Sequence, residues 1–210
     1  MALVDADYRF IWIDCGVPGS HSDAQVFSHS ELMEAINDGS LHFPEPAPLP
    51  GDDRLVPFFI IGDDAFALRT WMMKPFGQRN LTHDERIFNY RLSRARRIVE
   101  NGFGILANRF RCLLTMMHQQ PETVTKIVEA CVCLHNLLRT WFPGVPIAVD
   151  QEDNNHSVIP GAWRSGLQMH DVDNPQWGNR DTKEAKAQRA FLKYYYNDAV
   201  GSVHWQENMI

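Results

Sequence analysis

The strongest hydrophobic pattern in the chain runs from Thr82 to Arg111 and predicts one long α-helix. Apolar residues recur there at spacings of three or four, which places them on one face of a helix for about six turns. They are Phe88, Leu92, Ala95, Val99, Phe103, Leu106 and Phe110. Thr82 followed three residues later by Glu85 has the pattern of a capping box, so we expect the helix to begin there.

Before this helix, the pattern predicts a hairpin, two short helices and a strand. Residues 2–15 divide into two apolar runs around a polar turn, which is typical of a β-hairpin. A second capping box at residues 22–25 opens a short helix, and another helix is expected at 30–37. The proline-rich residues 39–57 are expected to form a surface loop. The continuous apolar run 58–61 is typical of a strand buried on both faces.

After the long helix, helical spacing predicts a second core helix at residues 123–141 and a last helix at 182–199. The core face of the second helix is expected to comprise Ile127, Cys131, Leu134, Leu138 and Trp141. We interpret His135 as a core or boundary histidine rather than a metal ligand.

Residues 143–181 lack periodicity and are rich in Asp, Asn, Gly and Pro, so we expect a mobile linker there. The predicted organisation is therefore a domain at residues 1–142, the linker, and a C-terminal helix and tail at 182–210 that pack back on the domain.

Composition and charge indicate a globular protein with an uneven charge distribution. The chain has 210 residues, is 44% hydrophobic and contains no apolar stretch long enough to span a membrane, so no membrane partner is expected. The net charge of −6 combines −8 for residues 1–78, +5 for 79–142 and −3 for 143–210. An acidic first third beside a basic middle is compatible with metal-binding carboxylates near a surface that binds a polyanion. Mixed solvated faces are the alternative.

The four cysteines lie inside apolar segments of the sequence. They are Cys15, Cys112, Cys131 and Cys133. The last two are two positions apart on a predicted helix and therefore face different ways. We expect all four to be free, mostly buried thiols of a reducing compartment, without a zinc site.

Acidic residues in two places are candidates for chemistry. Glu100 lies among the arginines of the long helix beside its apolar face, and it could be a solvated residue, an ion-pair partner of Arg96 or Arg97, or a metal ligand. Asp63 and Asp64 end the 58–61 strand, where they could form an ordinary turn or bind a cation. Acids at a strand end and on a neighbouring helix are the arrangement needed for two hard cations about 3.5–4 Å apart.

Four segments in a fixed order resemble the catalytic domain of PIF/Harbinger-type transposases and their host-domesticated, nuclease-like relatives, a branch of the DDE superfamily. The segments are VDADYRFIWIDCGVPGSHSDAQVF, IIGDDAFAL, NYRLSRARRIVENGFGILANRFR and CLHNLL. The likeness covers residues 2–141, with a weaker echo in the last helix and tail. It implies an α/β (α+β) fold with an RNase H-like mixed sheet flanked by helices.

The resemblance assigns site residues one position at a time. The family's second catalytic Asp follows a glycine at a strand end in a Gly-Asp-x-Ala/Gly-aromatic pattern, which corresponds to Asp63 with Phe66 as the aromatic. Asp64 would correspond only if the register shifted by one. The acid of the long helix follows an Arg-x-x-Val-like run and corresponds to Glu100. Asp23, in a Ser-Asp-Ala pattern of the family, is interpreted as a helix-start residue rather than a carboxylate near the site.

The family's first catalytic Asp has no counterpart by pattern in this sequence. It belongs to an Asp-Gly pattern on a strand that precedes the hairpin. Asp5, Asp7 and Asp14 lie in or after the hairpin and outside such a pattern. We therefore expect an N-terminal truncation relative to the family, a missing first strand in the sheet, and impaired two-metal catalysis.

The resemblance implies a metal-dependent DNA endonuclease that hydrolyses phosphodiester bonds by a two-metal mechanism, with Mg²⁺ or Mn²⁺ bound by Asp63 and Glu100. Arg94, Arg96 and Arg97 are candidates for phosphate contacts. The alternatives are a catalytically inactive transposase remnant that binds DNA or a protein, and a purely structural helical scaffold. A separate Myb-like DNA-binding partner and a location in the nucleus, with the cytoplasm second, are implied by the family only.

Overall fold

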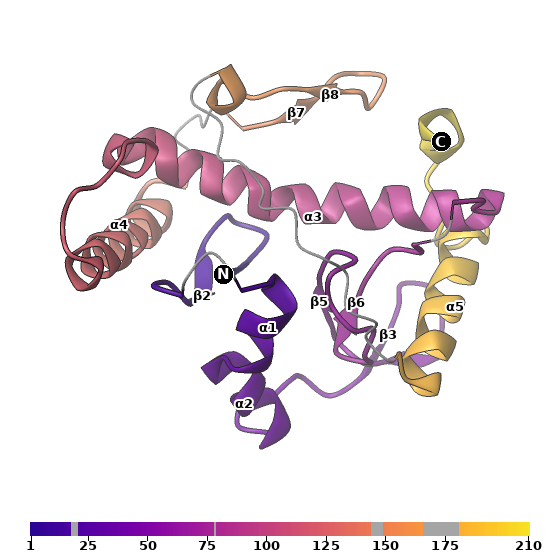
Figure 1. The fold of residues 1–210 in the computed structure, drawn as a ribbon. Helices are drawn as coiled ribbons and strands as arrows, with labels where there is room; N and C mark the ends of the chain where they lie inside the picture. The colour runs from indigo at the N-terminus through magenta and orange to yellow at the C-terminus, as the bar shows by residue number, and fades with distance from the viewer. Residues whose placement is uncertain (18–20, 78, 144–148, 166–180) are drawn as a thin grey trace. The chain divides into compact units, whose positions relative to one another are not determined.

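The long helix α3 (His83–Arg109) is the longest element in the part of the chain that the structure describes. The computed structural model describes residues 1–17, 21–77, 79–143, 149–165 and 181–210 (Figure 1). Its contacts divide the chain into unit 1, residues 1–21 and 97–173, and unit 2, residues 22–96 and 174–210. The first half of α3 belongs to unit 2 and the second half to unit 1, and each unit is described by itself.

The predicted start of α3 is confirmed. The Glu85 backbone N–H donates to the Thr82 hydroxyl over 3.4 Å, and the Thr82 backbone N–H donates to the Glu85 carboxylate over 2.9 Å. These reciprocal bonds form a capping box, which satisfies N–H groups that the first turn of a helix leaves without partners.

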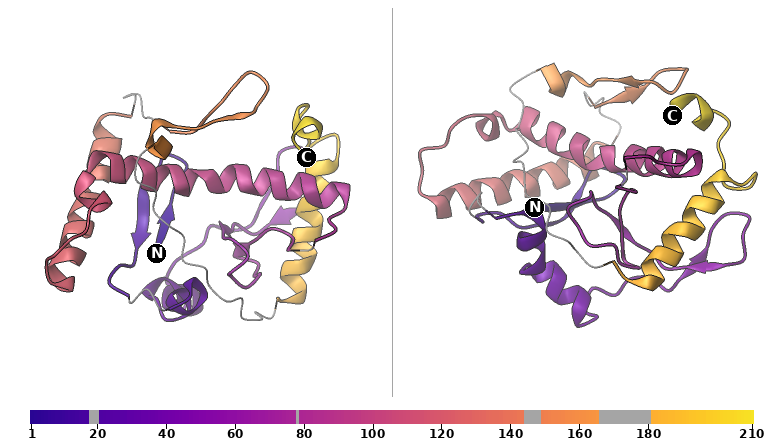
Figure 2. Two further views of the ribbon diagram at one scale, coloured as in Figure 1. Left: turned by 45° about the horizontal axis from the view of Figure 1, so that its top comes forward. Right: turned by 45° about the vertical axis from the view of Figure 1, so that its right-hand side comes forward.

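Unit 1 joins a hairpin, two helical segments and a second small sheet. The predicted hairpin is confirmed as β1 (Ala2–Val4) paired antiparallel with β2 (Phe10–Ile13). The second half of α3 lies between this hairpin on one side and the pair β7 (Gln151–Glu152) and β8 (Val158–Ile159) on the other (Figures 1 and 2).

Helix α4 (Pro121–Trp141) contacts the hairpin through hydrogen bonds and through apolar packing. The Asn136 amide accepts the Phe10 N–H over 2.9 Å and donates to the Phe10 carbonyl over 2.8 Å. The apolar core of unit 1 is formed by Phe10, Leu106, Cys131 and Val132. At Gly102 a Cβ would lie 3.2 Å from Val4, so the hairpin packs directly on the backbone of α3.

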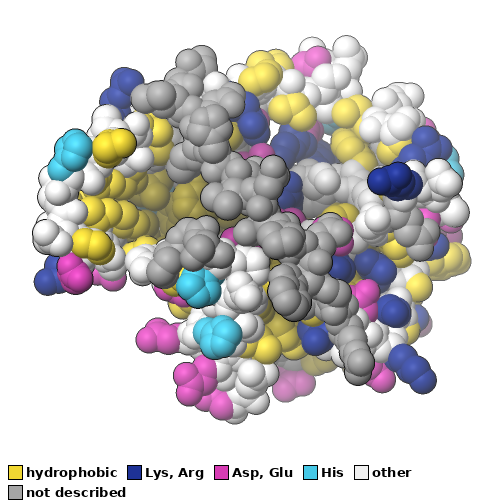
Figure 3. Space-filling view, in the orientation of Figure 1, with side chains coloured by type: hydrophobic (Ala, Val, Ile, Leu, Met, Phe, Trp, Pro, Cys, Tyr) yellow, Lys and Arg dark blue, Asp and Glu magenta, His cyan; other side chains and the backbone are white. Residues whose placement is uncertain are grey.

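The core face of α4 differs from its prediction. Cys131 is buried and Ile127 packs against the core as expected, but Leu134 and Trp141 are exposed, Trp141 to 64%, while His135 is fully buried. The expected face was rotated because the hairpin, and not the apolar spacing alone, determines which side of α4 is covered. Hydrophobic side chains accordingly gather at the surface where α4 lies (Figure 3).

His135 is confirmed as a core histidine of unit 1. Its Nε2–H donates to the Tyr8 carbonyl over 2.7 Å, and its ring packs edge-on against Phe10 at 5.2 Å between centroids. Burial lowers the pKa of the His135 imidazole, because removal from water disfavours its charged form.

Acidification is expected to destabilise unit 1 through His135. The pKa of His135 in the folded state lies below its ordinary value. The contribution of the neutral imidazole to the free energy of unfolding is therefore complete above about pH 6.5 and is lost as pH falls through the folded-state pKa. Urea unfolding at pH 7.5 and pH 5 should show this decrease, and His135→Gln should reduce it because glutamine keeps an N–H donor for Tyr8. His118→Gln, at an exposed histidine, is the control. An equal decrease in all three proteins would contradict the role of His135.

Unit 2 begins with two capped helices that match the predictions. Helix α1 (Asp23–Ser28) has Ser22 as its N-cap with a complete capping box, and α2 (Glu31–Asn37) has Ser30 as its N-cap. Asp23 is the first residue of α1, in agreement with its interpretation as a helix-start residue.

The core of unit 2 forms where the first half of α3 meets α5 (Lys183–Asn197). Its buried residues are Val56, Leu68, Met73, Phe88, Leu92, Ala185 and Leu192. The C-terminal tail contacts the same part of α3, because the Arg91 guanidinium donates to the Gly201 carbonyl over 3.2 Å and to the Gln206 amide oxygen over 3.1 Å.

Two predictions for residues 39–61 were wrong. The proline-rich segment contains an antiparallel pair, β3 (Ala47–Pro48) with β4 (Leu55–Val56). The expected strand is reduced to β5 (Ile60–Ile61), which is half-buried and pairs in parallel with β6 (Met72–Met73), while Phe58 is exposed. A run of four apolar residues was too short to determine burial on both faces.

The cysteine prediction was correct for pairing and wrong for burial. All four thiols are free, but Cys112 and Cys133 are exposed, Cys15 is half-buried and Cys131 is buried. Cys133 follows the rotated face of α4, which turns its side chain outward.

Mixed helices and short strands confirm the α/β class. In the described ranges the strands form four two-stranded sheets, so a single RNase H-like sheet with a missing first strand remains a prediction. Of the predicted linker, residues 144–148 and 166–180 lie outside the described residues, and the part between them forms β7, β8 and a 3₁₀ turn, Ala162–Ser165. No helix in the described part of the chain is long and apolar enough to cross a membrane.

Candidate metal and nucleic-acid site

Asp63 follows β5 and presents a half-exposed carboxylate in unit 2. One oxygen, Oδ1, accepts the Ala65 N–H over 2.9 Å, which fixes the side chain in a local turn. The other, Oδ2, lies 3.9 Å from the Arg96 guanidinium, and the side chain is 41% exposed. Asp63 therefore combines a fixed orientation with access from solvent.

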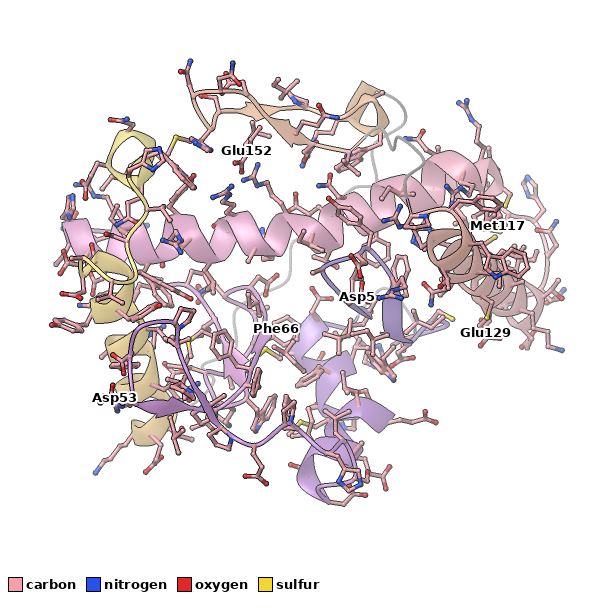
Figure 4. All side chains as sticks on the ribbon, turned by 180° about the vertical axis from the view of Figure 1, so that it is seen from behind. Asp5, Asp53, Phe66, Met117, Glu129 and Glu152 are labelled. Atoms are coloured by element: carbon pink, nitrogen blue, oxygen red, sulfur yellow. The ribbon has the colours of Figure 1, made fainter. Side chains whose placement is uncertain are left out.

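Close packing around Gly62 explains the glycine and the aromatic residue of the Asp63 pattern. A Cβ at Gly62 would lie 2.8 Å from the Phe66 ring and 2.9 Å from the Met72 sulfur, so glycine is required for this approach. Phe66 in turn packs edge-on against Phe27, with 5.4 Å between ring centroids, and is half-buried (Figure 4). The packing of Phe66 on Gly62 shapes the turn that carries Asp63.

Asp64 lies in a different environment from its neighbour. Its carboxylate is 3.4 Å from the Lys74 ammonium, which also lies 3.9 Å from Asp181. Asp181 accepts the Leu68 N–H over 3.1 Å, so this ion cluster connects the start of the C-terminal segment to the centre of unit 2. Asp64 thus has a structural partner that explains its presence.

Glu100 lies on the part of α3 that belongs to unit 1, and it accepts a hydrogen bond from Arg164, which follows α4 in the sequence. Arg164 donates through Nη2 to Glu100 Oε2 over 3.0 Å and to Asp150 Oδ2 over 2.6 Å. The Glu100 side chain is 36% exposed, whereas that of Asp150 is 1% exposed. The sequence offered ion pairing as one role for Glu100, and the structure supplies a partner, Arg164, that was not among the expected ones.

The Asp150 carboxylate anchors this arrangement. It accepts the Gly161 N–H over 2.8 Å and two further bonds from Arg164 Nε at 2.9 and 3.1 Å. Hydrogen bonds from Arg164 hold the pKa of the Asp150 carboxyl below its usual range, and the same bonds raise the pKa of the guanidinium. Both groups are therefore charged at neutral pH.

The three candidate phosphate-binding arginines each contact another side chain. Arg94 lies over the Trp205 ring at 5.3 Å, and Arg96 lies near Asp63. Arg97 donates to Glu152 over 2.7 Å, and Glu152 points from β7 toward α3 (Figure 4). Arg97 is more enclosed than Arg96, because its side chain is 19% exposed and that of Arg96 is 41% exposed.

The acidic residues near the N-terminus form hydrogen bonds and ion pairs within the hairpin. Asp5 accepts the backbone N–H groups of Asp7 and Arg9 and pairs with the Arg9 side chain at 3.0 Å, and Asp7 pairs with the same arginine at 2.9 Å. Asp14 follows β2, where its backbone closes the strand pair against Met1. Asp5 and Asp7 therefore have structural roles in the turn.

The donor chemistry at Asp63 and Glu100 fits a hard divalent cation. Both offer partly exposed carboxylate oxygens, the ligands that Mg²⁺ and Mn²⁺ prefer, and each carboxylate lies beside an arginine guanidinium. Asp63 belongs to unit 2 and Glu100 to unit 1, so each is described with its own neighbours. In the described residues, no group of three or more His, Cys, Asp or Glu side chains is arranged to hold a metal ion.

Comparisons with known proteins agree with the motifs. The family of DDE superfamily endonucleases matches residues 1–136. Protein ALP1-like from Arabidopsis thaliana is 26% identical over 89% of this chain and 42% of its own length. Putative nuclease HARBI1 is 29% identical in Bos taurus, over 72% of this chain and 41% of the relative, and 29% identical in Homo sapiens, over 65% and 36%. The chain thus spans about two fifths of the length of these relatives, and no solved structure matches it.

Proposed function

Because this chain belongs to the DDE superfamily endonucleases, as a Harbinger-derived domain, we propose that it is a metal-dependent nuclease domain that hydrolyses phosphodiester bonds in DNA. The observation that supports this most is the pair of partly exposed carboxylates, Asp63 and Glu100, at the two positions assigned by the family motifs. We further propose that the domain has the RNase H-like fold that the family resemblance implies.

Asp63 and Glu100 would bind Mg²⁺ or Mn²⁺ in this function. Two such cations, when bound, supply an activated water or hydroxyl and stabilise the leaving oxygen of an in-line displacement. The turn at Ala65 fixes Oδ1 of Asp63, and Oδ2, which lies 3.9 Å from the Arg96 guanidinium, would bind the cation. The first carboxylate of the family pattern has no counterpart in this sequence, so we propose that cleavage by this chain is slow.

The basic part of α3 would hold the DNA substrate. Arg94 and Arg96 are half-buried. A contact between these side chains and DNA phosphates would release counterions from the DNA, so the binding affinity would fall as the salt concentration rises. A Myb-like partner would supply target recognition, and the nucleus would be the place of action. The partner and the location rest on the family resemblance, whereas the DNA contact rests on the positive charge of α3.

A second candidate is a module that binds DNA or a protein without cleaving it. The observation that favours it is the exposed apolar surface on and just after α4, which includes Leu134, Leu137, Trp141 and Phe142. Apolar patches of this kind often mark protein interaction sites.

Removal of divalent cations distinguishes the two candidates. Supercoiled plasmid incubated with the chain and Mg²⁺ or Mn²⁺ should slowly accumulate nicked circles, and EDTA should stop the reaction because the carboxylates need a cation to act. DNA binding measured in parallel should persist in EDTA. Nicking that continues in EDTA would contradict the proposal, and binding without nicking under any condition would favour the second candidate.

A further inference from the structure

One nitrogen of Arg164 connects two carboxylates of unit 1. Nη2 lies 2.6 Å from Asp150 Oδ2 and 3.0 Å from Glu100 Oε2. Arg164 and Glu100 are 64 positions apart in the sequence. Arg164 therefore places a positive charge directly on the helix carboxylate to which the proposed function assigns a metal ion.

The position of Arg164 is fixed by contacts on both sides. Asn101 on α3 accepts, through its Oδ1, the Asp150 backbone N–H over 3.0 Å and the Trp163 indole N–H over 3.1 Å. The Arg164 guanidinium stacks on the Trp163 ring at 4.3 Å from its centroid. The side chain is thus held by a stacked ring beneath it and by the buried Asp150 beside it.

The surface of α3 is adapted to receive this segment. At Gly104 a Cβ would collide with the Trp163 ring, so only glycine allows the indole to lie against the helix. A second ion pair, Arg97 with Glu152 at 2.7 Å, connects the same segment to α3 further along. The docking of residues 149–165 therefore rests on several independent contacts, and Arg164 approaches Glu100 because of them.

A guanidinium in this position competes with a cation for the same oxygen. It occupies an acceptor site of Glu100 Oε2, and its charge repels a second cation a few ångströms away. A divalent ion bound at Glu100 would require Arg164 to leave this oxygen, although Arg164 could keep its bonds to Asp150.

We propose that Arg164 is a built-in competitor of the metal ion, so that the docked segment 149–165 is an autoinhibitory element that weakens cation binding at Glu100. The proposal rests on the proposed function in one respect, the assignment of Glu100 as a metal ligand. Movement of the segment away from Glu100 would then increase metal affinity.

Mn²⁺ binding measured by calorimetry and by electron paramagnetic resonance tests the competition without relying on cleavage. Arg164→Gln is expected to tighten Mn²⁺ binding by about threefold to tenfold, the range expected for loss of a partly exposed ion pair held in place by its surroundings. Arg164→Lys keeps the charge and should remain close to the wild-type affinity. Arg111→Gln removes an exposed charge from the same unit and should leave the affinity unchanged. Adding Glu100→Gln to Arg164→Gln should remove the gain.

Loss of Arg164 leaves a buried carboxylate, so the fold of each variant is checked by circular dichroism. If Arg164→Gln does not fold, Asp150→Asn/Arg164→Gln replaces it, because asparagine can still accept the Gly161 N–H and carries no charge. The same gain in affinity is expected from this pair.

The outcomes separate the two proposals. Unchanged or weaker Mn²⁺ binding in a folded Arg164 variant, with wild-type binding that still depends on Glu100, would overturn the competition and leave the metal site standing. Arg164 would then only position Glu100. Failure of every variant to bind Mn²⁺ would overturn both the competition and the assignment of Glu100 as a ligand.

Discussion

Glu100→Gln is expected to reduce metal-dependent nicking by about a hundredfold or more, since even changes to groups behind a metal ligand cost about tenfold to a hundredfold. The substitution removes the negative charge that a divalent cation needs while preserving shape. Glutamine can still accept the Arg164 N–H through its amide oxygen, so unit 1 should remain folded. Nicking rates at saturating Mn²⁺, together with thermal unfolding, measure the two effects separately.

The matched control for this variant is Glu129→Gln. Glu129 is an exposed carboxylate on α4 of the same unit (Figure 4), so its loss should leave nicking unchanged. Undiminished nicking in Glu100→Gln would remove this residue from the proposed site. Unfolding of unit 1 would instead make Glu100 a structural partner of Arg164.

Phe88→Ala is expected to destabilise unit 2 by about 3–5 kcal/mol, the usual cost of removing a fully buried aromatic ring. Phe88 is completely buried in the core between α3 and α5. Its ring packs edge-on against Phe76 at 5.2 Å and lies 6.0 Å from Tyr196, so truncation leaves a cavity bounded by two rings. Urea unfolding followed by circular dichroism measures the loss.

Tyr194→Ala is the control for the core of unit 2. Tyr194 lies on α5 in the same unit but is exposed, so its loss should change the free energy of unfolding by only about 0.5 kcal/mol. A similar small change for Phe88→Ala would show that the core does not form as described.

Local sequence signals predicted the elements of this fold well. The capping boxes at Ser22 and Thr82 placed helix starts correctly, because the residues involved are three positions apart and need no tertiary partner. The hairpin was predicted correctly for the same reason, since its turn and alternation lie within a few residues. The structure also supplied a reason for the Gly-Asp pattern, the contact of Phe66 with Gly62.

Features that depend on distant residues could not be predicted from the sequence. The exposed side of α4 follows from its bonds to Phe10, 126 positions away, which turn His135 inward. The Asp150–Arg164 anchor lies in a stretch without periodicity, and its contact with Glu100 joins residues 64 apart. An acid followed at some distance by an arginine is too common a pattern to indicate such a pair.

Mn²⁺ titration of Asp63→Asn and Asp64→Asn beside the unchanged chain tests the proposed metal site most directly. The two substitutions remove the same charge at adjacent positions, but only Asp63 is assigned to the metal, whereas Asp64 pairs with Lys74. We predict loss of Mn²⁺ binding and of nicking in Asp63→Asn and retention of both in Asp64→Asn. Equal effects of the two substitutions, or Mn²⁺ binding that survives in Asp63→Asn, would contradict a metal site at this position.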